Sequence, residues 1–394
     1  MELKQRLTVS KETRSVALFI FIMLIFSRFM FFFTHEIWTL LLESEVMPGG
    51  GISNVTKESF ISALMRWDAS WYIRIIDKGY DLVPWNHYKG DAANWAFFPL
   101  YPWSVSVFKT MSGLSTIKSG FLMSNILFFI SQIYVYKYLV LTRNKEIALT
   151  AVILFIMGPY NFYFSTLYTE SLFVMLLVMS FYYMKKENWY ACALSTAFLS
   201  ATRGTGVLFF IPLLINILLK EFKSTKNIFV VIKNIIMNHK KLFVLICAPA
   251  GLFMYMTFLY FHMGDPFGFF HVEIAWNRSN ANPVIILIEK IKEGGIPKLY
   301  LGAWGILGIV LSVYLMVTKR IEEGVFALLC MVIPMMSNLQ ALPRYFIGTA
   351  VTVFALVEWI HKLPELYRRG FMILYCTLNP ILLILWFAQH YIVT

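Results

Sequence analysis

The sequence has little charge and few cysteines for its length. Only 14% of its 394 residues are Asp, Glu, Lys or Arg, whereas soluble domains carry about 25%. Its four cysteines form no CxxC pair and lie next to no histidine. This pattern argues against a zinc-binding or disulfide-framed domain. We interpret the cysteines as small core residues, namely Cys192, Cys247, Cys330 and Cys376.

Hydrophobic residues make up 59% of the chain and gather in long runs separated by short basic clusters. A run of about 20 apolar residues spans a bilayer as a helix, because a helix satisfies its own backbone hydrogen bonds. We therefore predict a single all-α polytopic membrane domain over residues 1–394, with about eleven transmembrane helices. The expected spans are 15–41, 118–142, 146–160, 170–185, 188–202, 205–220, 241–262, 299–318, 323–338, 345–361 and 370–390.

The net charge of +12 comes from basic residues that flank the apolar runs. We interpret them as cytoplasmic anchors that face anionic lipid, so no nucleic-acid partner is expected. The 220–241 loop, with six lysines and one acid, is expected to be cytoplasmic, as is the N-terminus. An odd number of spans then places the C-terminus outside. No cleaved signal peptide is expected, since the first apolar run is too long and lacks a small-residue cleavage site.

Residues 43–117 are expected to form the first external loop. Apolar side chains recur in it at three- and four-residue spacing from Ile61 to Ile75, which predicts a helix lying on the membrane surface. The aromatic, proline-containing stretch 96–111 is expected to be juxtamembrane or re-entrant.

The same loop contains RWDASWY, residues 66–72. Desolvation by Trp67 and Trp71 is expected to raise the pKa of Asp68, and the adjacent Arg66 to lower it. Such an acid can act as a general base towards an acceptor hydroxyl. The alternative is a solvated loop acid between two interfacial tryptophans.

A second candidate region is GPYNFYFSTLYTES, residues 158–171. Thr169 and Ser171 can cap the following helix, which puts Glu170 at its start near the membrane edge. Capping alone is one reading. The many aromatic and hydroxyl side chains, Tyr168 among them, also suit contact with a sugar or a lipid headgroup.

Three arginines lie within or beside apolar runs: Arg28, Arg203 and Arg344. An ionisable group at membrane depth is costly and needs a partner. Phosphate matches the planar guanidinium fork. The alternatives are snorkelling to the interface or an internal salt bridge, for instance with Glu36.

The segment HMGDPFGFFHVE, residues 262–273, reads first as a turn, because Asp265-Pro266 follows a glycine. His262, Asp265, His271 and Glu273 lie close in sequence, but their spacing fits no strong ligand motif. We therefore expect no metal and no other cofactor. Acids cluster in the external loops and not deep in several spans, which argues against an ion pump or channel.

Several of these motifs, taken in order, resemble the PIG-V mannosyltransferases and their prokaryotic relatives between about residues 20 and 355. The motifs are RWDASWYIRIIDKGY, FFPLYP, PYNFYFSTLYTESLF, SATRGTGVLFF, GDPFGFF and ALPRYF. The resemblance implies the GT-C fold of multispanning glycosyltransferases. It also implies inverting transfer of a sugar, with mannose expected, from a polyprenyl-phosphate donor on the non-cytoplasmic face. One departure is Gly204-Thr205-Gly206, where the family often has Ser-Asn-Gly, and it bears on acceptor-side detail.

The resemblance implies Asp68 as catalytic base. It implies a sugar or acceptor site lined by Trp67, Trp71, Tyr72, Tyr168, Thr169 and Glu170, and donor phosphate held by Arg203 and Arg344. From the residue patterns we add Arg66 and Asp265 to the substrate-binding set and Arg28 to the phosphate set. The expected partners are a polyprenyl-phosphate sugar, a lipid-linked or cell-surface glycan acceptor and membrane lipids, in a bacterial plasma membrane. The alternatives are a lipid or polysaccharide transporter or flippase, and a structural assembly subunit.

Overall fold

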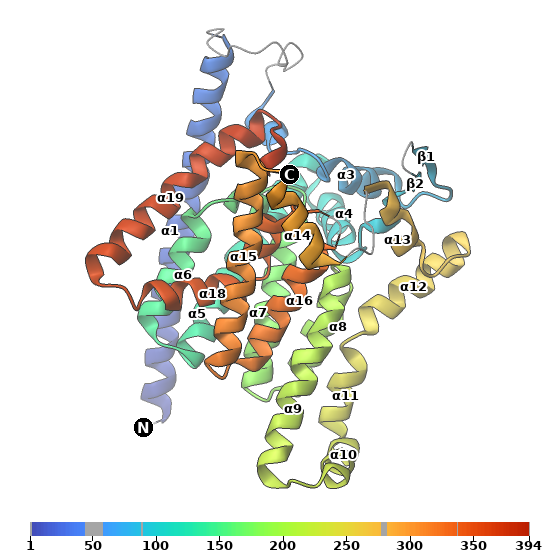
Figure 1. Ribbon diagram of the computed structural model, residues 1–394, viewed down its shortest axis with the longest axis vertical. Helices are drawn as coiled ribbons and strands as arrows, with labels where there is room; N and C mark the ends of the chain where they lie inside the picture. Colours follow the sequence, from blue (N-terminus) through green and yellow to red (C-terminus); the bar gives the residue numbers. More distant parts are fainter. Residues whose placement is uncertain (1, 44–57, 88–89, 277–281, 337, 394) are drawn as a thin grey trace.

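The computed structural model describes residues 2–43, 58–87, 90–276, 282–336 and 338–393. Almost every ordered element in these ranges is a helix (Figure 1). The α-helices are α1 Glu2–Glu43, α2 Phe60–Ala63, α3 Ala69–Lys78, α4 Leu100–Ser112, α5 Thr116–Thr142, α6 Lys145–Met157, α7 Glu170–Lys185, α8 Trp189–Ser200, α9 Phe210–Ser224, α10 Ile228–Met237, α11 His239–Cys247, α12 Ala250–Met263, α13 Gly268–His271, α14 Pro283–Lys292, α15 Ile296–Val317, α16 Ile321–Met335, α17 Leu342–Gly348, α18 Val351–Ile360 and α19 Glu365–Phe387.

Short 3₁₀ helices and one β-hairpin complete the described chain. The 3₁₀ helices are η1 Asn94–Ala96, η2 Asn161–Phe164, η3 Gly204–Phe209, η4 Val272–Trp276 and η5 Tyr391–Val393. Strands β1 Trp85–His87 and β2 Gly90–Ala92 pair antiparallel, with Trp85 opposite Ala92. The hairpin lies in the segment predicted to be the first external loop.

The predicted apolar runs all become helices, which confirms the all-α membrane class. Within the described residues, five helices are long and apolar enough to cross a membrane: residues 12–42, 116–142, 204–224, 296–317 and 365–387. A sixth span results if α11 and α12, which meet at a bend of 42°, are counted as one. Helices α6, α7, α8 and α16 and the α17–α18 pair occupy the other predicted runs but are shorter. The number of about eleven spans therefore stays a prediction.

Three predicted segments differ from the observed ones. The predicted loop 220–241 contains helix α10, because residues 228–237 form an apolar stretch, IFVVIKNIIM, that follows the capping residue Asn227. The stretch 96–111 forms a regular helix, α4, whose end is marked by Gly113 in the left-handed conformation (φ 69°). The predicted helix in residues 61–75 is split into α2 and α3. The helix break expected at Pro48 and the three glycines that follow it lies outside the described residues.

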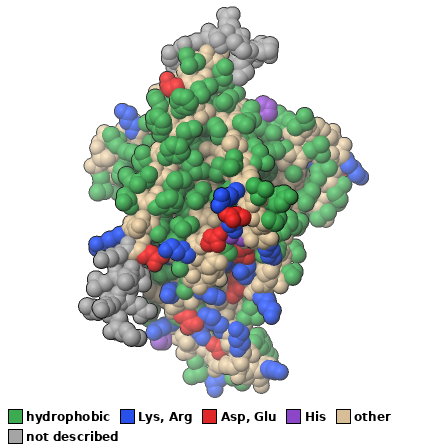
Figure 2. Space-filling view, turned by 90° about the vertical axis from the view of Figure 1, so that its left-hand side faces the viewer, with side chains coloured by type: hydrophobic (Ala, Val, Ile, Leu, Met, Phe, Trp, Pro, Cys, Tyr) green, Lys and Arg blue, Asp and Glu red, His purple; other side chains and the backbone are tan. Residues whose placement is uncertain are grey.

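The basic segments and the predicted external segments lie at opposite ends of the molecule. In Figure 1 helix α1 begins at the lower end, where α10 also lies, whereas α3, α4 and the hairpin lie in the upper part, with the C-terminus nearby. On the face shown in Figure 2, hydrophobic side chains cover most of the upper part and charged side chains gather in the lower part. We call the lower end the basic end and the upper end the loop end. Their separation agrees with the predicted arrangement.

One attachment of the loop end to the helical bundle is the Leu64 backbone carbonyl, which lies between α2 and α3. The Leu64 carbonyl accepts a hydrogen bond from the Thr166 hydroxyl at 2.9 Å and another from Trp386 Nε1 at 3.2 Å. Thr166 precedes α7 and Trp386 lies near the end of α19, and both side chains are buried. The turn that carries Asp68 is therefore held against two separate parts of the bundle.

Candidate active site

Asp68 is the residue that immediately precedes α3, and a buried tyrosine fixes its position. The Asp68 N–H donates to Tyr168 Oη at 3.1 Å, and the Tyr168 hydroxyl donates to the Arg66 carbonyl at 3.1 Å. Trp67 between them has φ 53°, in the left-handed region that non-glycine residues seldom occupy. One hydroxyl thus stabilises an unusual turn and sets the direction of the Asp68 side chain.

Four charged side chains from distant segments meet beside this turn. Arg344, on α17, contacts Asp68 Oδ2 through Nη1 at 2.8 Å and Glu170 Oε1 through Nε at 2.5 Å. Arg203, just before η3, also ion-pairs with Glu170 Oε1. We call Asp68, Glu170, Arg203 and Arg344 the outer cluster. Its two carboxylates and two guanidiniums balance in charge, which makes burial of the group tolerable.

The four side chains of the outer cluster differ in solvent exposure, and not all of their hydrogen-bonding atoms have partners. Glu170 is fully buried, the two arginine side chains are nearly so, and the Asp68 side chain remains 29% exposed. Glu170 Oε2 and the neighbouring Thr169 Oγ1 are buried without a hydrogen-bond partner in the described structure. Buried polar atoms are normally paired, so these two acceptors favour a site that takes up a polar ligand.

Aromatic rings surround both arginines. The Arg344 guanidinium lies 4.3 Å from the centre of the Tyr168 ring, and that of Arg203 lies 5.2 Å from the Tyr345 ring. These cation–π contacts hold the guanidinium planes while leaving N–H groups available. Tyr72 is buried and packs edge-on against Tyr168, with ring centres 6.3 Å apart. It therefore supports the site wall from behind.

Tryptophans form an open aromatic surface next to Asp68. Trp67 is 41% exposed. The Trp71 ring lies 5.5 Å from both Trp85 and Trp276 and is stacked on Phe97. Trp85 and Trp276 were not predicted as site residues. They come from the hairpin and from η4, and no local spacing in the sequence connects them to Trp71.

Arg66 is directed away from Asp68. Its Nη1 forms an ion pair with Glu58 Oε2 at 2.9 Å, so Arg344 and not Arg66 is the cation that faces the Asp68 carboxylate. The predicted electrostatic effect of Arg66 on Asp68 stays a prediction.

Arg28 lies apart from the outer cluster. Its Nε and Nη1 donate to the amide oxygens of Asn125 and Asn161, each at 2.7 Å, and the guanidinium packs 4.7 Å from the Phe31 ring centre. The salt bridge to Glu36 considered above is not formed, since Glu36 pairs with His35 at 3.2 Å. The structure thus brings Arg203 and Arg344 together but leaves Arg28 in a separate amide-lined position.

Asp265 is engaged within its own turn. Its carboxylate accepts from the Phe267 N–H at 2.9 Å and contacts His271 Nδ1 at 2.6 Å, after Gly264 with φ 85°. His262 Nε2 lies 3.2 Å from the Tyr80 carbonyl oxygen. These contacts agree with the turn interpretation, and none of them joins Asp265 to the outer cluster.

Asp77 anchors α3 to the helices beneath it. Its Oδ1 accepts from Lys109 Nζ on α4 at 2.7 Å and from the Thr116 hydroxyl on α5 at 2.5 Å. Partial burial opposes ionisation, but these two hydrogen bonds outweigh it and hold the pKa of the Asp77 carboxyl below its usual range. The helix that carries Asp68 at its start is thereby fixed near its other end as well.

Solved structures with a similar arrangement come from an archaeal oligosaccharyltransferase of Archaeoglobus fulgidus. The apo form is 11% identical with a TM-score of 0.49, covering 94% of this chain and 56% of that chain. The form described as AglB in complex with an inhibitory peptide and a dolichol-phosphate is 12% identical with a TM-score of 0.47 and the same coverage. The complex with Zn and sulfate is 13% identical with a TM-score of 0.43, covering 81% and 48%. The chain thus spans about half the length of these proteins.

A comparison with protein families gives a specific result. No curated protein matches the sequence significantly. Residues 10–280, most of the chain, match the family described as Mannosyltransferase (PIG-V). The matched segment includes Asp68, Glu170 and Arg203 of the outer cluster and ends before Arg344. The chain is therefore an integral membrane protein that belongs to the PIG-V mannosyltransferase family.

Proposed function

We propose that the protein transfers a hexose, most simply mannose, from a polyprenyl-phosphate donor to a hydroxyl of a lipid-linked or cell-surface glycan acceptor. The observation that carries this proposal is the contact between Asp68 and Arg344. It places a partly exposed carboxylate 2.8 Å from a guanidinium that, with Arg203, surrounds a buried glutamate. A base for the incoming hydroxyl and cations for the leaving phosphate then lie side by side.

The transfer is a single displacement that needs only these groups. The acceptor oxygen bonds to C1 of the sugar while the bond from C1 to the phosphate oxygen breaks, which inverts the anomeric centre. Asp68 takes the hydroxyl proton, and the phosphate leaves with the bonding electron pair. Arg344 and Arg203 stabilise the developing charge on that phosphate from fixed positions. We expect no metal to be needed, because the guanidiniums supply the positive charge.

Glu170 holds the two arginines in this proposal. It contacts Arg203 and Arg344 through the same oxygen, Oε1. Arg344 can then give up its contact with Asp68 when a phosphate arrives, since Glu170 still orients it. This exchange frees the Asp68 carboxylate for the acceptor hydroxyl. The site is therefore switched by donor binding at Arg344.

The tryptophans on the open side supply a surface for sugar. Trp67 and Trp85 are the more exposed rings, and Trp71 contacts both Trp85 and Trp276. Flat apolar rings with a few convergent polar groups are typical of small-molecule sites. We assign this surface to the acceptor glycan, because Trp67 and Trp71 belong to the same segment as Asp68, the base in this proposal.

We further propose that the site works on the non-cytoplasmic face, in a bacterial plasma membrane. The basic end carries the start of α1 and the lysine-rich segment around α10, and the outer cluster lies towards the loop end (Figure 1). Positive loops remain cytoplasmic in membrane proteins. The donor lipid and the acceptor therefore meet the enzyme outside the cell.

The decisive experiment is sugar transfer by an Asp68→Asn variant in proteoliposomes. The assay uses a radiolabelled mannosyl polyprenyl phosphate and a lipid extract of the host membrane as acceptor pool. We expect transfer to fall by roughly 10²–10⁴-fold, the usual contribution of a general base, with an unchanged elution profile.

The matched control is Asp91→Asn, which removes an exposed acid from strand β2 and should leave transfer intact. Full activity of Asp68→Asn would remove Asp68 from the mechanism. Movement of the donor across the bilayer without a glycosylated product would favour the transporter instead.

A further inference from the structure

A cavity of about 190 Å³ lies on the opposite side of the bundle from the outer cluster, towards the basic end. It is formed where α5 and α7 end, where α15 turns into α16, and at the middle of α9. Its polar wall includes Tyr138, Thr142, Arg143, Lys185, Asn216, Lys319, Arg320, Glu322 and Glu323. We call it the inner pocket. Its volume equals that of roughly six liquid waters, which suits a small headgroup and not a peptide or nucleotide.

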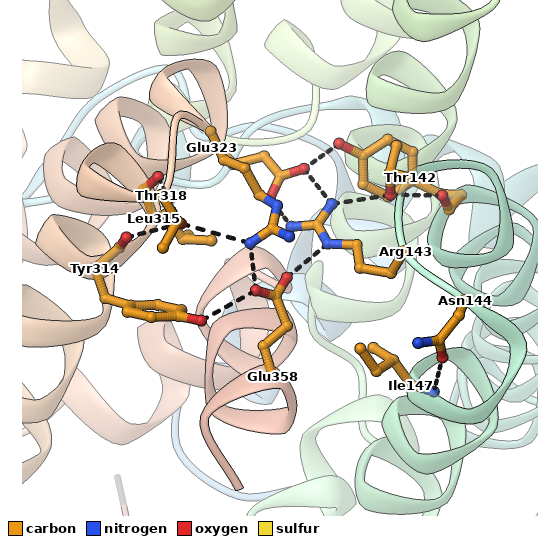
Figure 3. Close-up of polar contacts among 11 residues, drawn as sticks. Thr142, Arg143, Asn144, Ile147, Tyr314, Leu315, Thr318, Glu323 and Glu358 are labelled. Carbon is orange, nitrogen blue, oxygen red and sulfur yellow. Dashed lines mark hydrogen bonds and ion pairs between the residues drawn. The ribbon is translucent and has the colours of Figure 1, made fainter. Parts of the chain in front are cut away.

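One wall of the inner pocket is a closed network of ion pairs, shown in Figure 3. Arg143 donates from Nε to Glu358 Oε1 at 2.6 Å and from Nη1 to Glu323 Oε1 at 2.6 Å. Arg320 pairs with Glu358 Oε2, and the Tyr138 hydroxyl donates to Glu323. The two arginines and two glutamates balance in charge. This inner cluster, Arg143, Arg320, Glu323 and Glu358, therefore needs no counterion from outside.

The remaining polar groups of the pocket are not balanced in this way. Lys185 and Lys319 form no ion pair with any residue that the structure describes. Glu322 accepts from Asn216 Nδ2 at 2.8 Å and faces no basic partner in the same set. Asn216 is only 4% exposed, yet its Oδ1 is buried without a partner. The pocket thus presents two unpaired ammonium groups and two acceptors, one of which has no hydrogen-bond partner.

We propose that the inner pocket binds the headgroup of an aminophospholipid from the adjacent leaflet. The phosphate lies between Lys185 and Lys319, with the remaining N–H groups of Arg320 as further donors. The primary ammonium donates to Asn216 Oδ1 and to the Glu322 carboxylate, which satisfies the orphaned acceptor. The headgroup carries one charge of each sign, and the unpaired residues match both.

The apolar part of the pocket wall indicates a lipid as the source of this headgroup. Leu141 and Met184 line the cavity beside the charged groups, and Leu141 belongs to the exposed surface of α5. An acyl chain leaving the headgroup can follow this surface into the bilayer. Basic residues at the ends of transmembrane helices lie at the depth of lipid headgroups. The proposal is independent of the reaction at Asp68.

The test is lipid retention by the full chain, measured by native mass spectrometry in detergent. Phosphatidylethanolamine, phosphatidylcholine and phosphatidylglycerol are added in equal amounts. We expect phosphatidylethanolamine to be retained about tenfold better than the other two, which is the ratio that one charge-assisted hydrogen bond supplies. Phosphatidylcholine cannot donate through its methylated ammonium, and phosphatidylglycerol has no ammonium. Equal retention of all three lipids would overturn the proposal.

Variants of neighbouring lysines separate the pocket from general surface charge. Lys185→Ala should weaken phosphatidylethanolamine retention by about tenfold, whereas Lys186→Ala, the exposed neighbour outside the pocket wall, should not. Equal losses of retention in both variants would assign lipid binding to general surface charge and overturn the proposal of a site in the inner pocket. Glu322→Gln should reduce the preference for phosphatidylethanolamine over phosphatidylcholine while total lipid retention persists. An unchanged preference in that variant would contradict the ammonium half of the site.

The source of the headgroup is decided by competition. Free phosphoethanolamine, at the same concentration as the lipid, should leave the lipid in place, because it lacks the acyl contacts along Leu141. Complete displacement by the free compound would overturn the lipid as occupant. The retention and competition measurements use the same purified protein. Transfer activity is measured in parallel, so that loss of folding is recognised.

Discussion

The outer cluster and the inner cluster both join two arginines to two carboxylates, but they differ in how completely these groups are paired. In the inner cluster every carboxylate oxygen of Glu323 and Glu358 accepts at least one hydrogen bond. In the outer cluster Glu170 Oε2 accepts none, and Asp68 keeps part of its surface in contact with solvent. The same chemical groups thus form a closed network in one place and an open one in the other.

The difference separates structural from functional use of buried charge. Buried ion pairs seldom add net stability over an apolar core of the same shape, but breaking one leaves a costly uncompensated charge. A closed network is therefore best explained as a fastening between helices. An open one, which leaves an acid exposed and an acceptor unpaired, is typical of a site that completes its bonding with a ligand.

The largest effect should come from opening the closed network. Arg143→Met leaves two buried glutamates without their main partner, so we expect about 3–5 kcal/mol of stability to be lost. Activity per folded molecule should change little. The measurement is the thermal unfolding midpoint in detergent, with Arg369→Met, an exposed arginine, as control. A midpoint equal to that of the control would show that the inner cluster is not the fastening proposed here.

The next effect should fall on catalysis. Arg344→Met removes the group that contacts both Asp68 and Glu170, and transfer should drop by roughly 10²–10³-fold. Stability should decline less than in Arg143→Met, because Glu170 keeps Arg203 and Asp68 reaches water. Arg344→Lys keeps the charge but loses the two-armed contact, so it should recover only part of the rate. If Arg344→Met lost stability but no activity per folded molecule, the two clusters would be alike in role.

A smaller, mixed effect is expected at the tyrosine that holds the Asp68 turn. Tyr168→Phe removes the hydroxyl bonded to the Asp68 N–H and the Arg66 carbonyl, at a cost of about 1–3 kcal/mol. Because the turn loosens, kcat should fall more than KM changes. Tyr190→Phe, at an exposed ring, serves as control. Unchanged kcat together with reduced stability would make Tyr168 a packing residue only.

The smallest effect concerns the anchor of α3 and depends on pH. The pKa of Asp77 is lowered in the folded protein, so its ion pair stabilises the fold above the unfolded pKa of about 3.9. That contribution is lost as the pH falls through the folded pKa. Asp77→Asn should therefore lower the unfolding midpoint near neutral pH by an amount equivalent to less than about 1 kcal/mol, and the gap to wild type should close below about pH 4. A gap that persists in acid would contradict this assignment.

Sequence patterns predicted the helices well because apolar runs in a membrane protein leave few alternatives. The predicted spans 118–142 and 170–185 correspond closely to α5 and α7. Segments that depend on tertiary contacts were harder. The apolar run in 228–237 was hidden by its flanking lysines, and the hairpin β1–β2 has no strong strand signal.

For the site, too, some features could be predicted from the sequence and others depended on tertiary contacts. Arg203 and Arg344 were singled out as costly charges beside apolar runs, Asp68 as an acid between two tryptophans, and Glu170 as an acid at a helix start. The structure brings the four together. Arg28 shows that the same rule also selects a residue outside the outer cluster, whose Nε and Nη1 donate to two amides while its Nη2 is buried without a partner in the described structure. Glu323 and Glu358 carried an equal signal, since both are acids inside apolar runs. Arg143 flanks an apolar run and so fell among the basic residues interpreted as cytoplasmic anchors, and the inner cluster was missed.

The contact between Asp68 and Arg344 joins residues 276 positions apart, and this has a consequence for biosynthesis. Membrane insertion proceeds from the N-terminus, so Asp68, Glu170 and Arg203 reach the membrane well before Arg344. During that interval Glu170 has only one of its two arginines, and the carboxylate base faces no phosphate-holding partner. In the proposed mechanism, glycosyl transfer therefore begins only when α17 has docked, so an incomplete chain consumes no donor lipid.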